Sequence, residues 1–104
     1  MDERTWEVVE QLRDWLDAQS GVSGDLATVM RVLKISEEAG EVAEAVHGAM
    51  RANPRKGASH TWEDVQKELC DVTVTALIAL ASITPDARMV FEGYLQRIAD
   101  RSLT

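Results

Sequence analysis

Apolar residues recur every three or four positions along most of this chain, which is the spacing of amphipathic helices. The first such stretch covers about residues 3–18, with its stripe at Trp6, Val9, Leu12 and Leu16. The second runs from about residue 25 to residue 50, with its stripe at Val32, Ile35, Ala39, Val42 and Val46. Glycine and serine in "QSGVSGD" separate the two helices.

The second half of the chain predicts two more helices. Pro54 and Gly57 end the second helix, and Thr61 with Asp64 is close to a capping box that opens a third, which continues to about residue 83. Thr84 followed by Pro85 then predicts the N-cap and first position of a fourth helix. Its buried side is expected to hold Val90, Tyr94, Leu95 and Ile98.

These elements predict an all-α, four-helix bundle-like fold in a single domain over residues 1–104. From Val72 to Ile83 the third helix is apolar or Thr/Ser on every side, which indicates burial all round. Four helices of this size leave part of each helix in water. We therefore expect homo-oligomerisation, as a homodimer or homotetramer, to complete the bundle.

Composition narrows the possible partners. A net charge of −7 argues against a nucleic acid polymer, which is bound by clustered Lys and Arg. The single cysteine, Cys70, lies in an expected core helix and cannot form an internal disulfide, which favours a reducing compartment. The N-terminus lacks the apolar region of a signal peptide, and the longest uncharged run, Val72 to Pro85, is too short to cross a bilayer. We expect a cytoplasmic protein without membrane contact.

Four carboxylates stand out on the second and third helices. Glu38 and Glu41 in "EEAGEVAEA" are three residues apart at the border of the apolar stripe, and so are Glu68 and Asp71 in "KELCDV". If the two helices pack antiparallel, both pairs face each other across one groove. A solvated acidic face is the simpler interpretation, especially for Glu37 and Glu44. However, partly desolvated like charges repel strongly unless a cation lies between them.

Oxygen ligands of this kind favour Mg²⁺, with Mn²⁺ as a substitute, or Ca²⁺. A zinc site would need a Cys/His cluster, which the sequence lacks. A di-iron site would need Glu-x-x-His, whereas His47 and His60 lie away from the motifs.

These two motifs resemble the MazG-like nucleoside triphosphate pyrophosphohydrolases, over about residues 28–82. The family signature, E-x-x-E on one helix and E-x-x-D on the next, falls on Glu38, Glu41, Glu68 and Asp71 as metal ligands. The resemblance implies Mg²⁺-dependent hydrolysis of a nucleoside triphosphate to the monophosphate and pyrophosphate, and assembly into dimers or larger oligomers. It also implies catalytic roles for Glu38 and Glu41.

Three cations and one further acid complete the predicted site. Lys34 lies one turn before Glu38, where it either contacts phosphate or only pairs with that glutamate. Arg55 and Lys56 in the connecting loop either reach the phosphates or only keep the turn soluble. Either Glu37 or Glu44 could orient or deprotonate the attacking water. We favour Glu37 as the catalytic residue.

Two other functions remain open at this point. A helical oligomerisation module could bind nucleotide without hydrolysing it, and a related phosphohydrolase could act on a non-nucleotide pyrophosphate. The second helix carries no aromatic residue after its acidic motif, where some relatives stack the base, so the preferred base is not identified. Trp6 and Trp15 are expected to anchor the core.

Overall fold

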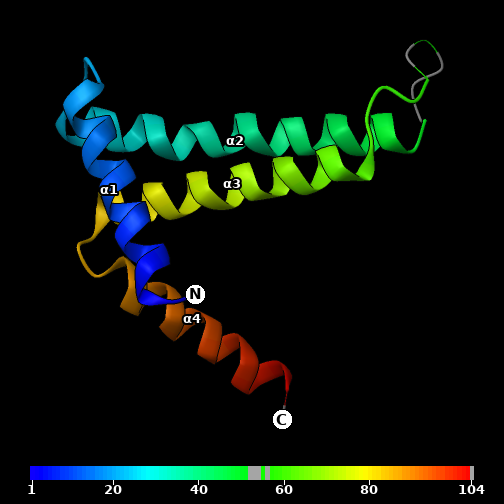
Figure 1. Ribbon diagram of the computed structural model, residues 1–104. Coiled ribbons are helices and arrows are strands. Elements are labelled where there is room, and N and C mark those ends of the chain that lie inside the picture. The colour runs from blue at the N-terminus through cyan, green and yellow to red at the C-terminus, as the bar shows by residue number, and fades with distance from the viewer. Residues whose placement is uncertain (52–54, 56, 104) are drawn as a thin grey trace.

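The computed structural model describes residues 1–51, 55 and 57–103, and these form four helices (Figure 1). The helices are α1 (Glu3–Gln19), α2 (Gly24–Ala49), α3 (Trp62–Ile83) and α4 (Ala87–Ser102). The predicted all-α class is confirmed. The limits of the first three helices fall within about one residue of those predicted from apolar spacing.

Capping side chains fix the starts of α1 and α3. The Asp2 carboxylate accepts a hydrogen bond from the Thr5 N–H at 2.9 Å. At α3 the predicted capping box is confirmed: Thr61 Oγ1 accepts from the Asp64 N–H at 3.2 Å, and Asp64 Oδ2 accepts from the Thr61 N–H at 2.9 Å. The backbone hydrogen bond from Thr61 is the main reason that the pKa of Asp64 is lowered.

The predicted start of the fourth helix is wrong by two residues. Thr84 is extended, with φ −140° and ψ 140°, and its N–H donates to the Leu80 carbonyl at 3.1 Å, so it closes α3. Its hydroxyl accepts from the Asp86 N–H at 3.1 Å across the intervening turn. Asp86 is therefore the N-cap and α4 begins at Ala87, because Thr84 is needed to end the preceding helix.

α2 and α3 form a long antiparallel pair, as predicted (Figure 1). α1 crosses one end of this pair, and α4 leaves the same end at an angle. A small core lies where α1, α3 and α4 meet, and its buried members are Trp6, Val9, Leu77, Ala81 and Ala87. Trp6 packs against Phe91 with ring centroids 5.8 Å apart, which confirms Trp6 as a core anchor.

Much of the apolar surface predicted to be buried is exposed in the single chain. Trp15 is 59% exposed and Cys70 is exposed as well, so neither is a core residue. The expected buried side of α4 is also open, with Val90, Tyr94, Leu95 and Ile98 at 37%, 60%, 54% and 49% exposure. The radius of gyration is 16.5 Å, whereas about 13 Å is expected for a compact chain of this length.

α3 is not buried on every side. Leu77, Ala79 and Ala81 are buried, but Val74 and Ile83 are 40% and 62% exposed. The reason is that α1 and α2 cover only part of its circumference, and α4 turns away from it (Figure 1). Within the described ranges, α3 and α4 have the length and apolarity to cross a membrane only when taken together, bent by 119°, and no single helix has them.

Candidate metal centre

Three glutamates meet between α2 and α3. Glu38 and Glu41 lie one turn apart on α2, and Glu68 lies on the facing stretch of α3. One carboxylate oxygen from each lies within 4.8 Å of the others, which is a spacing that a single cation can bridge. The side chains of Glu38 and Glu68 are only 13% and 19% exposed, whereas Glu41 lies on the open side. The antiparallel pairing therefore brings the two acidic motifs together.

The polar contacts around this cluster leave one carboxylate oxygen unmatched. Glu68 Oε1 lies 4.0 Å from Lys67 Nζ, while Glu68 Oε2 is buried and has no hydrogen-bond partner among the described residues. A buried acceptor without a partner loses its hydration with nothing in exchange, at a cost of roughly 1–3 kcal/mol. A bound cation would remove that cost and the repulsion among the glutamates.

Lys34 is the cation nearest to the cluster in the described contacts. Its Nζ lies 3.5 Å from a Glu37 oxygen and 3.6 Å from a Glu38 oxygen. The pKa of Lys34 is raised, first by the charge of Glu37 and then by that of Glu38. Lys34 therefore pairs with Glu38, as one of the two predictions has it, and its side chain is 57% exposed to solvent.

The donor set fits a hard divalent cation. It consists of carboxylate oxygens, with no sulfur or imidazole in the cluster. Mg²⁺ keeps several of its own waters in protein sites, so three carboxylates leave room for phosphate oxygens and water. His47 is exposed and belongs to no such cluster among the described residues, so the structure adds nothing in favour of zinc or di-iron.

Asp71 is not part of the three-glutamate cluster. It is half-buried on α3, one turn beyond Glu68, so it lies on the same flank but at the next level. Its role as a fourth ligand stays a prediction. Glu37 is 72% exposed at the edge of the cluster, where solvent can reach it, and Glu44 is exposed on the same helix.

Of the two loop residues predicted to contact phosphate, the structure describes only one. Arg55 is exposed beyond the end of α2, and Lys56 lies outside the described residues. His60 is half-buried and packs with Ser59 against Gly48 on α2, with 2.9 Å between Ser59 Oγ and His60 Nδ1. It closes the loop against the helix, in line with a structural role at the helix start.

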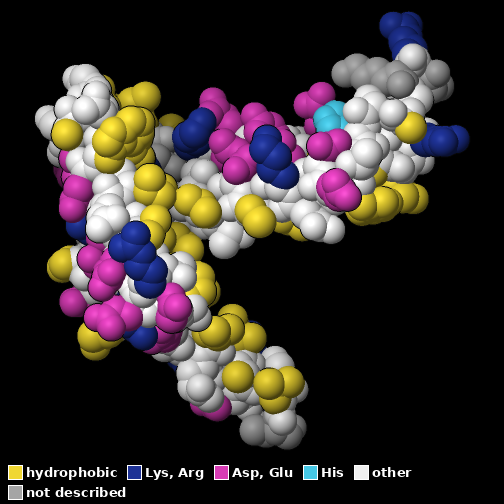
Figure 2. Space-filling view, viewed as in Figure 1, with side chains coloured by type: hydrophobic (Ala, Val, Ile, Leu, Met, Phe, Trp, Pro, Cys, Tyr) yellow, Lys and Arg dark blue, Asp and Glu magenta, His cyan; other side chains and the backbone are white. Residues whose placement is uncertain are grey.

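Figure 2 shows acidic side chains gathered along the middle of the α2–α3 pair, with lysine and arginine among them, and hydrophobic side chains exposed along α4. On this face, one group of charged side chains thus lies on the stretch that carries the glutamate cluster, and another lies over the region of α1. The exposed hydrophobic side chains of α4 lie away from the glutamate cluster.

A groove beside the cluster was not predicted from the sequence. It has a volume of about 490 Å³ and runs between the end of α1 and the first half of α2. Its apolar lining consists of Leu16, Val22, Ala27, Met30 and Leu33. Lys34 and Glu37 line its other end, so the groove opens toward the glutamates.

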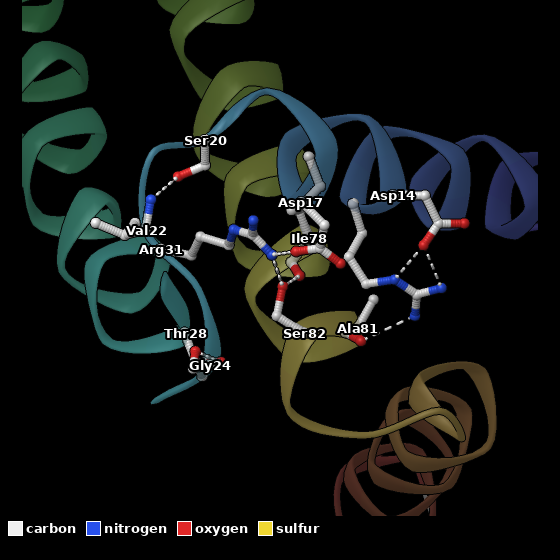
Figure 3. Close-up of polar contacts among 11 residues, drawn as sticks. Asp14, Asp17, Ser20, Val22, Gly24, Thr28, Arg31, Ile78, Ala81 and Ser82 are labelled. Atoms are coloured by element: carbon white, nitrogen blue, oxygen red, sulfur yellow. Dashed lines mark hydrogen bonds and ion pairs between the residues drawn. The ribbon is translucent and has the colours of Figure 1, made fainter. Parts of the chain in front are cut away.

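Arg31 lies between this groove and the junction of α1, α2 and α3 (Figure 3). Its Nη1 contacts Asp17 Oδ1 at 2.8 Å and donates to Ser82 Oγ at 3.0 Å. The side chain is 12% exposed, and Nη2 is buried without a partner among the described residues. The sequence signal that could have indicated Arg31 is its position, three residues before Lys34 at the border of the apolar stripe.

Comparison of the chain with protein-family models, with curated proteins and with solved structures finds no match to any of them. The geometry of the glutamate cluster and the two sequence motifs are therefore what a function for this chain can be inferred from.

Proposed function

We propose that this protein is a Mg²⁺-dependent nucleoside triphosphate pyrophosphohydrolase that acts in the clearance of nucleotides from the cellular pool. The observation that carries the proposal is the meeting of Glu38, Glu41 and Glu68 between two antiparallel helices, with a buried, unmatched oxygen on Glu68. These are three of the four positions at which the motifs resemble the MazG-like signature. Mn²⁺ is expected to replace Mg²⁺.

In the proposed site the bound metal supplies a Lewis acid for the triphosphate and lowers the pKa of water. Glu38, Glu41 and Glu68 would hold it through their carboxylate oxygens, with Asp71 at the next level as a fourth ligand. Lys34 offers an exposed ammonium one turn away, which can neutralise charge on the bound phosphates. Arg55 and Lys56 are proposed to contact the phosphates from the loop.

Glu37 is the proposed general base. Its carboxylate is exposed at the edge of the cluster, so it can accept a hydrogen bond from the attacking water and then take its proton. Attack at the α-phosphorus breaks the bond to the β-phosphate oxygen. The products are the nucleoside monophosphate and pyrophosphate.

The test is incubation of the purified chain with common and damaged NTPs and dNTPs, with and without Mg²⁺, followed by separation of the products. We expect monophosphate and pyrophosphate, both lost with chelator and in Glu38→Gln. Glu10→Gln removes the same charge from an exposed site on α1 and should leave the rate unchanged. Turnover that survives in Glu38→Gln would exclude this site as the catalytic one.

A second candidate is a nucleotide-binding oligomerisation module without catalysis. The open shape of the single chain and the exposed apolar side of α4 favour assembly as a main property. Under this alternative, nucleotide raises the melting temperature but no nucleotide is hydrolysed. Either function is proposed to operate in a homodimer or homotetramer, because exposed apolar faces of this extent usually mark protein contacts.

A further inference from the structure

We propose that the groove between α1 and α2 binds the nucleobase of the substrate, and that it prefers bases presenting a carbonyl oxygen toward Arg31. This inference rests on the proposed function, because it assigns the other end of the same ligand. No sequence motif indicated the groove. It comes from the position, lining and charge of the cavity itself.

The groove and the glutamate cluster lie along one row of α2. Ala27, Arg31, Lys34, Glu38 and Glu41 are spaced by four, three, four and three residues, which keeps them on one side of a helix. The rise from Met30 to Glu38 is roughly 12 Å. A nucleotide with its phosphates at the glutamates therefore has its base over the groove, with Lys34 between the two.

The lining of the groove suits a flat, mostly apolar group. Leu16 of α1, Val22 of the following loop, and Met30 and Leu33 of α2 all line it. Met30 and Leu33 are 53% and 62% exposed in the free chain, so a seated base would cover apolar surface that now faces water. A volume of about 490 Å³ lies within the usual range of small-molecule sites.

Arg31 gives the groove a polar preference. Asp17 and Ser82 hold Nη1, and the guanidinium keeps an unmatched donor at Nη2. Arginine can donate hydrogen bonds but cannot accept them. A base carbonyl therefore accepts a charge-assisted hydrogen bond from the guanidinium, whereas a base amino group brings a second donor against it. Because Nη2 is covered in the free chain, we expect this contact to form when the base seats and the neighbouring side chains shift.

Two matched pairs of nucleosides test the polar preference without phosphates or metal. Uridine and cytidine differ in the exocyclic group at C4, carbonyl against amino, and in the adjacent N3, which is an N–H donor in uridine and an acceptor in cytidine. Inosine and adenosine differ in the same way at C6 and N1. We expect amide shifts of α1 and α2 groove residues on titration, with the carbonyl member of each pair binding roughly tenfold more tightly. Equal binding within both pairs would overturn the role of Arg31.

Two neighbouring substitutions test the groove. Met30→Glu places a carboxylate in the groove, whereas Val29→Glu adds the same charge at a neighbouring residue of similar exposure, 50% against 53%, that does not line it. We expect Met30→Glu to weaken nucleoside binding and to raise the KM for triphosphate roughly tenfold with kcat little changed. Val29→Glu should change neither.

The outcomes separate this inference from the proposed function. Triphosphate hydrolysis with an equal KM in both variants would overturn the groove and leave the function standing. Nucleoside shifts in the groove that are lost in Met30→Glu, without hydrolysis of any triphosphate, would support the groove and leave only the binding module.

Discussion

At the scale of single residues, the glutamate cluster combines a structural cost with a proposed function. Glu38, Glu41 and Glu68 bring like charges within 4.8 Å of one another, and one oxygen of Glu68 is buried without a partner. Such an arrangement lowers the stability of the free chain. A cation bound at the proposed metal site would offset this repulsion, so we expect metal binding to raise the stability of the chain.

The first prediction concerns Glu68→Gln. Without metal, we expect a melting temperature equal to or above that of the wild type, since one charge is lost and the new amide can donate to Glu38 or Glu41. Mg²⁺ at ten times its dissociation constant should stabilise the wild type by about 1.4 kcal/mol and the variant hardly at all. Scanning calorimetry with and without Mg²⁺ checks both points.

Glu10→Gln is the control for this measurement, because it removes a charge from an exposed position on α1. Its response to Mg²⁺ should match that of the wild type. If Glu68→Gln gained as much stability from Mg²⁺ as the wild type does, the cluster would not be the metal site.

The helical spacing of the motifs was enough to predict that Glu38, Glu41 and Glu68 share one site. It was not enough for Asp71, because whether the second member of an i,i+3 pair reaches the same point depends on how the two helices are rotated and tilted. Arg31 was missed for a related reason. Its importance comes from Asp17 and Ser82, which lie on other helices and are far away in the sequence.

The second prediction concerns Asp64 in the capping box. Its pKa is lowered in the folded chain, chiefly by the hydrogen bond from the Thr61 backbone, so folding favours the ionised carboxylate. The resulting stability is fully present above the unfolded pKa, near 3.8, and is lost as the pH falls through the lower folded pKa. The difference in unfolding free energy between the wild type and Asp64→Asn should be constant above this range and shrink within it.

Urea unfolding of both proteins at several pH values measures that difference. A carbon-detected NMR titration of the Asp64 carboxylate gives the folded pKa directly. A folded value at or above 3.8 would contradict the capping geometry.

At the scale of whole elements, two glycines of α2 are expected to respond in opposite ways to alanine. Gly48 is buried, and a Cβ there would collide with the side chains of His60 and Ser59, whereas Gly40 has nothing within 4 Å of that position. Gly48→Ala should destabilise the chain by about 1–3 kcal/mol through overpacking. Gly40→Ala should stabilise it by about 0.5–1 kcal/mol through helix propensity.

The comparison of these variants by urea unfolding is the third prediction. Both substitutions add one methyl group to the same helix, so they differ mainly in what surrounds it. Wild-type stability in Gly48→Ala would mean that the loop before α3 does not pack closely on α2.

Helix limits show what periodicity can and cannot predict. The first three helices follow their apolar stripes and caps closely, because strong breakers lie between them. At the start of α4, Thr84 and Asp86 are both good N-caps around Pro85. The choice depends on Thr84 being needed to close α3, which sequence preference does not reveal.

At the scale of the whole molecule, the helices leave an open shape of 47 × 46 × 22 Å (Figure 1). α4 packs near its start through Ala87 and Phe91, and its later apolar residues remain exposed. Apolar periodicity predicted that this side of α4 is buried, and in the single chain it is exposed. It could not predict what covers that side, because a pattern within one chain does not distinguish an intramolecular neighbour from a second copy.

The fourth prediction follows from the proposal that a second copy covers α4. Leu95 is 54% exposed, so Leu95→Glu should be tolerated by the single chain but should place an uncompensated charge in the interface. We expect analytical ultracentrifugation to show an oligomer for the wild type and a monomer for the variant. The wild-type melting temperature should rise with protein concentration, and that of the variant should not.

Gln96→Glu adds the same charge at the next residue of α4, which is polar and exposed in the wild type. It should keep the oligomer, because position 96 points about 100° away from position 95. If Leu95→Glu abolishes both the oligomer and triphosphate hydrolysis, the site needs the partner copy. A wild-type chain that stays monomeric at all concentrations would refute the interface.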